Sequence, residues 1–225
     1  MPISNKLDDL FGRNAGSIPV FYLRALAYHE SGFNPQNVNP KSNATGLFQI
    51  TSVALADFNK ASGTNHGMAA LVDPNLATKV AVRHLSAIIN LYATVASLRA
   101  DWSSRRFIEL LTFGWNSGHN AVVRLAKLLE AQGVKGERVT VDTVGQLAGK
   151  LKVPYVSEPA RISWAKTVAS TALTPLGPGP NVASFFPRTS FVAAAQPLLL
   201  AAAVLGAGVV AFNALGETHG RRAHA

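Results

Sequence analysis

Apolar residues recur with helical spacing along much of residues 1–173, in stretches separated by turns rich in Gly, Asn and Pro. We expect helices at about 19–30, 73–95, 105–115, 121–131 and 161–173. The second of these begins at Asp73 and Pro74, a capping residue followed by a first-turn proline. Alternation of apolar and polar residues, the pattern of a strand, is found only at 134–141. The pattern therefore predicts a mainly α domain.

The hydrophobic pattern changes at the end of this domain, for which we expect the bounds 1–173. Residues 174–190 contain four prolines and two glycines, which is typical of a linker. Residues 191–215 carry no charged side chain, and 25 residues are enough to cross a bilayer as a helix. We expect this stretch to associate with a membrane, with a buried alanine-rich helix or an unstructured tail as alternatives. A basic tail, 216–225, follows.

The composition narrows the classes of function. With 21 Lys and Arg against 12 Asp and Glu, the net charge is +9, which favours polyanionic partners such as nucleic acid, anionic lipid or the bacterial wall. No cysteine is present, so disulfides, thiolate catalysis and cysteine-ligated zinc are excluded. Charged side chains interrupt residues 1–16, which therefore do not form a secretory signal peptide. A function at the cell wall would need another route out of the cytoplasm.

The first expected helix ends in a residue suited to acid catalysis. Ser17 is its expected N-cap, Pro19 lies in the first turn, and Gly32 follows its end. One face has the spacing i, i+3, i+4, i+7 and consists of Leu23, Leu26, Ala27 and Glu30. A carboxyl at the edge of an apolar face is desolvated, which raises its pKa and lets it donate a proton near neutral pH. The alternative for Glu30 is a helix-end glutamate that rotates into solvent.

Three short motifs follow one another along the chain, and the first of them begins at Glu30, the end of this helix. They are ESGFNP at 30–35, GLFQI at 46–50 and FGWNSG at 113–118. Together they resemble the ordered signatures of lytic transglycosylases related to goose-type lysozyme, which have a Glu-Ser pair, Gly-Leu-Met-Gln, and Ala-Tyr-Asn with a following glycine. The helix expected from Asp73 is similar to a helix of that family, and 154–168 loosely resembles its closing segment.

The resemblance implies a role for each matching residue. Glu30 would be the catalytic acid and base, and Ser31 would hydrogen-bond near the acetamido group of the sugar. The other four residues would line a groove. Gln49 and Asn116 would be its polar contacts, and Phe48 and Trp115 would be its apolar walls. Helix capping or turn formation is the alternative for Ser31 and Asn116, and core packing is the alternative for Phe48.

The chain departs from the family pattern at three positions. Phe48 stands where methionine is usual, Gly114 replaces alanine, and Trp115 replaces a tyrosine whose hydroxyl lies near the acid. An indole N–H donates a hydrogen bond but cannot accept one. The resemblance therefore indicates Glu30 as the acid more clearly than it indicates how Glu30 is held.

The resemblance covers about 17–170 and implies a lysozyme-like α+β fold that acts on peptidoglycan without a metal or organic cofactor. Glycoside hydrolases generally use two carboxylates, whereas a lytic transglycosylase needs one. No Asp or Glu occurs from residue 31 to residue 56, the region that would supply a close partner in goose-type hydrolases. We therefore expect cleavage of the MurNAc-β-1,4-GlcNAc bond with formation of 1,6-anhydroMurNAc. Hydrolysis is the alternative, with Asp57, Asp73 or Glu109 as its second carboxylate.

Other classes of function fit the sequence less well. His29 and Glu30 open like the zinc motif H-E-x-x-H, but position 33 is Phe and the second histidine is missing. The basic residues are scattered and do not alternate with aromatic ones, so nucleic acid is not an expected partner. A cross-link endopeptidase and a non-catalytic membrane or virion protein remain alternatives. The lack of a signal peptide, the charge and the apolar C-terminal stretch lead us to expect a bacteriophage lysin or virion-associated protein that acts on the periplasmic or cell-wall peptidoglycan.

Overall fold

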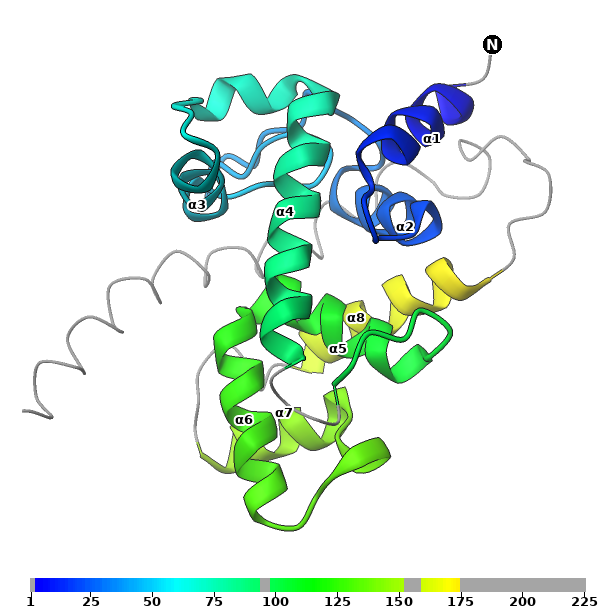
Figure 1. The fold of residues 1–225 in the computed structure, drawn as a ribbon, viewed down its shortest axis with the longest axis vertical. Coiled ribbons are helices and arrows are strands. Elements are labelled where there is room, and N and C mark those ends of the chain that lie inside the picture. Colours follow the sequence, from blue (N-terminus) through cyan, green and yellow to red (C-terminus); the bar gives the residue numbers. More distant parts are fainter. Residues whose placement is uncertain (1–2, 94–97, 152–158, 175–225) are drawn as a thin grey trace, which may run out of the picture.

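The computed structural model describes residues 3–93, 98–151 and 159–174, which form α-helices and two short 3-10 helices (Figure 1). In chain order these are α1 (Ile3–Asn14), α2 (Val20–Ser31), α3 (Ser52–Ser62), η1 (Met68–Val72), α4 (Pro74–Tyr92), α5 (Arg105–Ser117), α6 (His119–Ala131), η2 (Gly136–Arg138), α7 (Val141–Lys150) and α8 (Pro159–Leu173). These ranges contain no β-strand, and only the loop before α3 has isolated bridges, between Val38 and Thr45 and between Thr45 and Ile50. The expected mainly α fold is confirmed.

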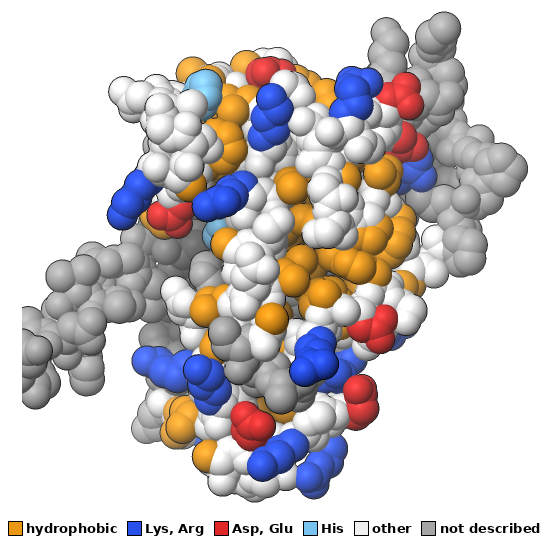
Figure 2. Space-filling model, viewed as in Figure 1, with side chains coloured by type: hydrophobic (Ala, Val, Ile, Leu, Met, Phe, Trp, Pro, Cys, Tyr) orange, Lys and Arg blue, Asp and Glu red, His pale blue; other side chains and the backbone are white. Residues whose placement is uncertain are grey.

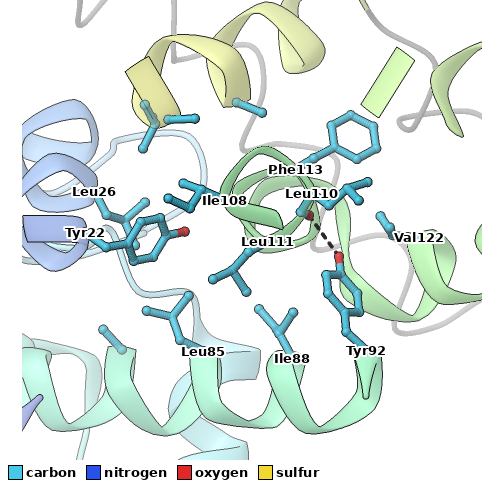
Figure 3. Close-up of a cluster of buried hydrophobic side chains, with 14 of the residues drawn as sticks. Tyr22, Leu26, Leu85, Ile88, Tyr92, Ile108, Leu110, Leu111, Phe113 and Val122 are labelled. Atoms are coloured by element: carbon cyan, nitrogen blue, oxygen red, sulfur yellow. Dashed lines mark hydrogen bonds between the residues drawn. The ribbon is translucent and has the colours of Figure 1, made fainter. Parts of the chain in front are cut away.

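The core forms around α5, which contacts α4, α6, α7 and α8. Figure 3 shows side chains of α2, α4, α5 and α6 meeting in one apolar cluster. The labelled members are Tyr22, Leu26, Leu85, Ile88, Tyr92, Ile108, Leu110, Leu111, Phe113 and Val122, all of them fully buried. Helix α8, the last described helix, packs against both α5 and α2. Figure 1 shows it beside α5.

Local capping chemistry explains where α2 and α4 begin and end. The Asp73 side chain accepts a hydrogen bond from the Asn75 N–H at 2.9 Å, so the expected start of α4 is confirmed. Gly32 ends α2 in the left-handed conformation, with φ 62°. The expected N-cap Ser17 is wrong, because the chain turns into the helix at Pro19. Helix α4 ends at Tyr92, short of the expected 95, and 94–97 lie outside the described residues.

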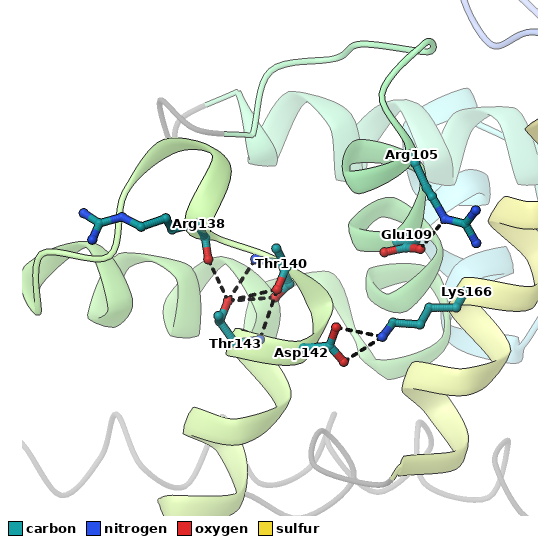
Figure 4. Close-up of polar contacts among 7 residues, drawn as sticks. All are labelled: Arg105, Glu109, Arg138, Thr140, Asp142, Thr143 and Lys166. Atoms are coloured by element: carbon teal, nitrogen blue, oxygen red, sulfur yellow. Dashed lines mark hydrogen bonds and ion pairs between the residues drawn. The ribbon is translucent and has the colours of Figure 1, made fainter.

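The candidate strand at 134–141 does not form. This stretch contains η2 and then the first residue of α7. Thr140 caps α7 by accepting from the Thr143 N–H, while the Thr143 hydroxyl oxygen accepts from the Thr140 N–H at 2.8 Å (Figure 4). Among the described residues no strand is available to pair with this stretch, and the reciprocal cap directs the chain into a helix instead.

Three helices were not expected, namely α1, α3 and α7, whereas the other five coincide with expected ones.

Among the described residues, none of the helices is both long enough and apolar enough to cross a bilayer. The stretch 191–215, the linker 174–190 beyond its first residue and the tail 216–225 lie outside the described residues. On the face shown in Figure 2, Lys and Arg side chains are spread out, with acidic side chains among them, rather than gathered in one basic tract.

Candidate active site

Glu30 lies in the last turn of α2, where the helix stops abruptly. Gly32 and Phe33 both have positive φ, 62° and 65°, so the backbone leaves the helical path directly after Ser31. For a non-glycine residue such as Phe33 this conformation is uncommon. The turn leaves Glu30 half-buried at the end of the apolar stripe that enters the core. The expected helix-end position of the carboxyl is thus confirmed, while its role as the acid stays a prediction.

Trp115 of α5 supplies the polar partner of Glu30. Its indole Nε1–H donates a hydrogen bond to Glu30 Oε1 at 2.8 Å, across 85 positions of sequence. Burial raises the pKa of Glu30 to about 8, and the Trp115 hydrogen bond, which favours the charged form, acts in the opposite direction. Because the effect of burial is the larger, the carboxyl is mostly protonated at pH 7 and can donate a proton.

The indole of Trp115 also contacts an aromatic ring of α4. The ring of His84, on α4, meets it edge to face with centroids 5.3 Å apart. Trp115 is partly buried, and the next residue, Asn116, is 7% exposed. Arg161 of α8 donates from Nη1 to the Asn116 carbonyl oxygen at 2.9 Å and to Asn116 Oδ1 at 3.3 Å. Asn116 therefore has a structural partner, and its expected contact with substrate stays a prediction.

Tyr22, which interacts electrostatically with Glu30, was not expected as part of the site. Tyr22 is fully buried, and its hydroxyl is hydrogen-bonded to Thr112 Oγ1 at 3.0 Å. Burial raises the pKa of Tyr22, the Thr112 hydrogen bond lowers it, and a charged Glu30 raises it further. The phenol is thus within electrostatic reach of the acid. A buried tyrosine needs a partner for its hydroxyl, but no pattern in the sequence identifies Thr112 as that partner.

The segment 45–50 is fixed against the end of α2 by hydrogen bonds. Ser31 Oγ donates to the carbonyl oxygen of Leu47 at 2.8 Å, which joins the two motifs directly. Gln49 has φ 47° and is 4% exposed, and its amide nitrogen donates to the carbonyl oxygens of Asn37 and Gly46, both at 3.1 Å. Both side chains stabilise this loop, and their expected contacts with a sugar stay predictions.

Gly46 is required by a close approach of two backbone segments. Its φ is 82°, and a Cβ at this position would lie 2.3 Å from the carbonyl oxygen of Leu71 in η1. No other residue type fits without a shift of backbone. The glycine that begins the second motif is thus explained by packing.

Phe48 does not wall a groove in this structure. Its side chain is 0% exposed and packs against Phe11 of α1, with ring centroids 5.7 Å apart. A ring with no exposed surface cannot contact a ligand. The core-packing alternative describes Phe48, and the interpretation of it as an apolar wall is corrected.

A cavity of about 750 Å³ between α7 and α8 is lined by none of the expected site residues. Its two cationic side chains, Arg105 and Lys166, are paired with Glu109 and Asp142 respectively (Figure 4). Within the described ranges, no group of three or more metal-ligating side chains comes together.

One comparison with known protein families gives a match. The family model of the transglycosylase SLT domain matches residues 12–133, which include Glu30, the 45–50 loop and Trp115. No curated protein and no solved structure matches the chain. The match covers more than half of the chain, ends before α7 and α8, and agrees with the lytic transglycosylase motifs in the sequence. The chain thus belongs to the lytic transglycosylase family defined by the SLT domain.

Proposed function

We propose that the chain is a peptidoglycan lytic transglycosylase that cleaves the MurNAc-β-1,4-GlcNAc bond with Glu30 as its acid and base. Family membership supports peptidoglycan degradation of the lytic transglycosylase type in general. The observation that carries the specific proposal is the half-buried Glu30 carboxyl, whose pKa is raised to about 8 and which is bonded to the Trp115 indole at 2.8 Å.

In the first step Glu30 gives its proton to the glycosidic oxygen as the bond from the anomeric carbon to that oxygen breaks. GlcNAc leaves with a 4-hydroxyl, and the acetamido carbonyl of MurNAc stabilises the cationic anomeric carbon from the opposite face. The Trp115 N–H is placed to stabilise the carboxylate that forms on Glu30, since a hydrogen bond to the charged form favours that form. This donor does for the ionised acid what a tyrosine hydroxyl would do in the family pattern.

In the second step the ionised Glu30 takes the proton of the MurNAc 6-hydroxyl while its oxygen bonds to the anomeric carbon. The product is a 1,6-anhydro sugar, Glu30 is protonated again, and no water is consumed. Two causes set the pKa of Glu30, burial and the Trp115 bond, and no second carboxylate among the described residues contributes. Asp73 caps α4 and Glu109 binds Arg105, so each has a structural partner. These observations favour one-carboxylate chemistry over hydrolysis.

The test is mass spectrometry of the fragments that the protein releases from purified peptidoglycan. Wild type should release glycans with 1,6-anhydroMurNAc ends, and Glu30→Gln should release at least about 100-fold less, as expected for loss of a general acid. Glu109→Gln is the matched control, because it neutralises a carboxyl on α5 that already binds Arg105. Reducing MurNAc ends would show hydrolysis, and cut stem peptides with intact glycans would show an endopeptidase. Either result would overturn the proposal.

The setting of this activity is a further part of the proposal. The net charge of +9 supports attraction to the anionic wall, and we propose action on the wall from a lysin or a virus particle, with membrane association through 191–215. Co-sedimentation of the full chain with anionic lipid vesicles, compared with a chain ending at residue 190, tests the membrane association. Equal sedimentation of the two chains would count against it.

A further inference from the structure

Helix α8 lies beyond the part of the chain that the family model matches, yet it contacts both helices that carry the acid and its partner. The match ends at residue 133, whereas α8 comprises Pro159–Leu173. α8 packs against α5, which carries Trp115, and against α2, which carries Glu30 (Figure 1). At each of these contacts a polar side chain of α8 bonds to the immediate sequence neighbour of a site residue.

On the α5 side this side chain is Arg161. It is 1% exposed, and its Nη1 donates to the carbonyl oxygen and the Oδ1 of Asn116, at 2.9 and 3.3 Å. Burial of a guanidinium group is costly unless it is hydrogen-bonded in a fixed geometry. A buried arginine at this place therefore ties the end of α5 tightly to α8.

The position of this bond along α5 explains its effect. Asn116 is the penultimate residue of α5, and the last carbonyl groups of a helix have no partner within the helix. Arg161 satisfies one of these groups and places a positive charge at the negative end of the helix dipole. Asn116 directly follows Trp115, so the bond fixes the last turn of α5, from which the indole reaches Glu30.

On the α2 side the corresponding side chain is Thr171. Its Oγ1 lies 2.8 Å from Nε2 of His29, the residue before Glu30. Burial lowers the pKa of His29 to about 4, so the ring is neutral at pH 7 and this contact is a bond between uncharged groups. One rigid helix thus holds the residues beside both members of the Glu30–Trp115 pair, ten positions apart along its length.

We infer that Arg161 is a positioning residue for the proposed acid. Through its bonds to Asn116, Arg161 sets the position from which the Trp115 indole bonds to Glu30. The inference rests on the proposed function for its meaning in catalysis. Its structural content, that Arg161 controls the Glu30–Trp115 bond, holds or fails separately from that function.

The direct test is the indole N–H resonance of Trp115 in the full-length protein labelled with ¹⁵N-tryptophan. The chain has three tryptophans, and loss of one resonance in Trp115→Phe assigns the peak. In wild type this resonance should follow the ionisation of Glu30, with a midpoint near its pKa of about 8. In Arg161→Met the resonance should move toward that of an unbonded indole and lose most of its response to pH. Arg161→Lys keeps the charge and should be intermediate.

Activity provides the second readout. We expect kcat to fall about 10- to 100-fold in Arg161→Met, with KM changed less than about threefold, because a displaced catalytic pair costs rate more than binding. Lys166→Met is the matched control: it removes a cation from the same helix, where Lys166 pairs with Asp142, and should keep kcat within about twofold of wild type.

The inference would be overturned if Arg161→Met left the Trp115 resonance and its titration unchanged. It would also be overturned if Lys166→Met displaced the resonance and weakened its titration as much as Arg161→Met does. If Arg161→Met does not fold, the resonance in Arg161→Lys decides the question, and a wild-type titration there would equally overturn it. If wild type releases no anhydro product, the proposed function fails, but the resonance still shows whether Arg161 controls the bond to Glu30.

Discussion

Replacing Glu30 with glutamine should change how the stability of the folded chain depends on pH. Burial raises the pKa of this carboxyl from 4.5 to about 8, against the smaller opposite effect of the Trp115 hydrogen bond. Between these two values the unfolded chain has lost the proton while the folded chain keeps it. The unfolded state therefore binds fewer protons, and the free energy of unfolding falls as pH rises. Below pH 4.5 both states are protonated, and Glu30 contributes no pH dependence.

The size of the effect follows from the two pKa values. One pKa unit corresponds to about 1.4 kcal/mol, so the difference between 4.5 and about 8 amounts to roughly 5 kcal/mol once Glu30 is ionised in both states. Stability is lost progressively from pH 4.5 to about pH 8 and not further above it. Glutamine has nearly the same shape and does not ionise, and its side-chain oxygen can still accept the Trp115 N–H. Glu30→Gln should therefore lack the loss of stability that ionisation of Glu30 causes.

Urea unfolding of both proteins at half-unit steps from pH 5 to pH 9 measures the effect as a difference at each pH. Other titrating groups are common to the two proteins and cancel. The difference should grow in favour of Glu30→Gln across the interval, level off above about pH 8, and leave the m-value unchanged. A difference that does not vary with pH would show that solvent reaches the carboxyl, and the argument for Glu30 as a neutral acid would fail.

Two further substitutions test the geometry of the site. Gly46→Ala should lower the free energy of unfolding by about 2–4 kcal/mol, because it combines a positive φ with a backbone clash. Gly63→Ala, at a similar φ with nothing within 4 Å, should cost only about 1 kcal/mol; equal losses in urea unfolding would contradict the clash. Trp115→Phe removes the donor that lowers the pKa of Glu30, so the alkaline limb of the kcat/KM profile should move upward from about pH 8. An unmoved limb would mean that the indole does not stabilise the carboxylate.

Much of the fold was determined by chemistry within a few residues of sequence. The Asp73–Pro74 start of α4 and the Gly32 end of α2 depend on a side-chain cap and on a residue free to adopt positive φ, and both were predicted. Periodicity likewise predicted five of the helices and placed Glu30 at the end of a buried stripe. The alternation at 134–141 made it a candidate strand that did not form, because alternation over a few residues means little without a partner strand to bond to.

The candidate site depends both on local sequence and on tertiary packing. The sequence by itself identified Glu30 and the three motifs, because the motifs are short and local. Only the tertiary structure showed that Trp115 bonds to Glu30 across 85 positions, that Phe48 is buried in the core, and that Arg161 holds the end of α5. The physical reason is that periodicity tells which face of an element is buried but not which other element covers that face. Whether a carboxyl is desolvated, and which donor reaches it, depends on that covering element, and so it was decided only when α2, α5 and α8 packed together.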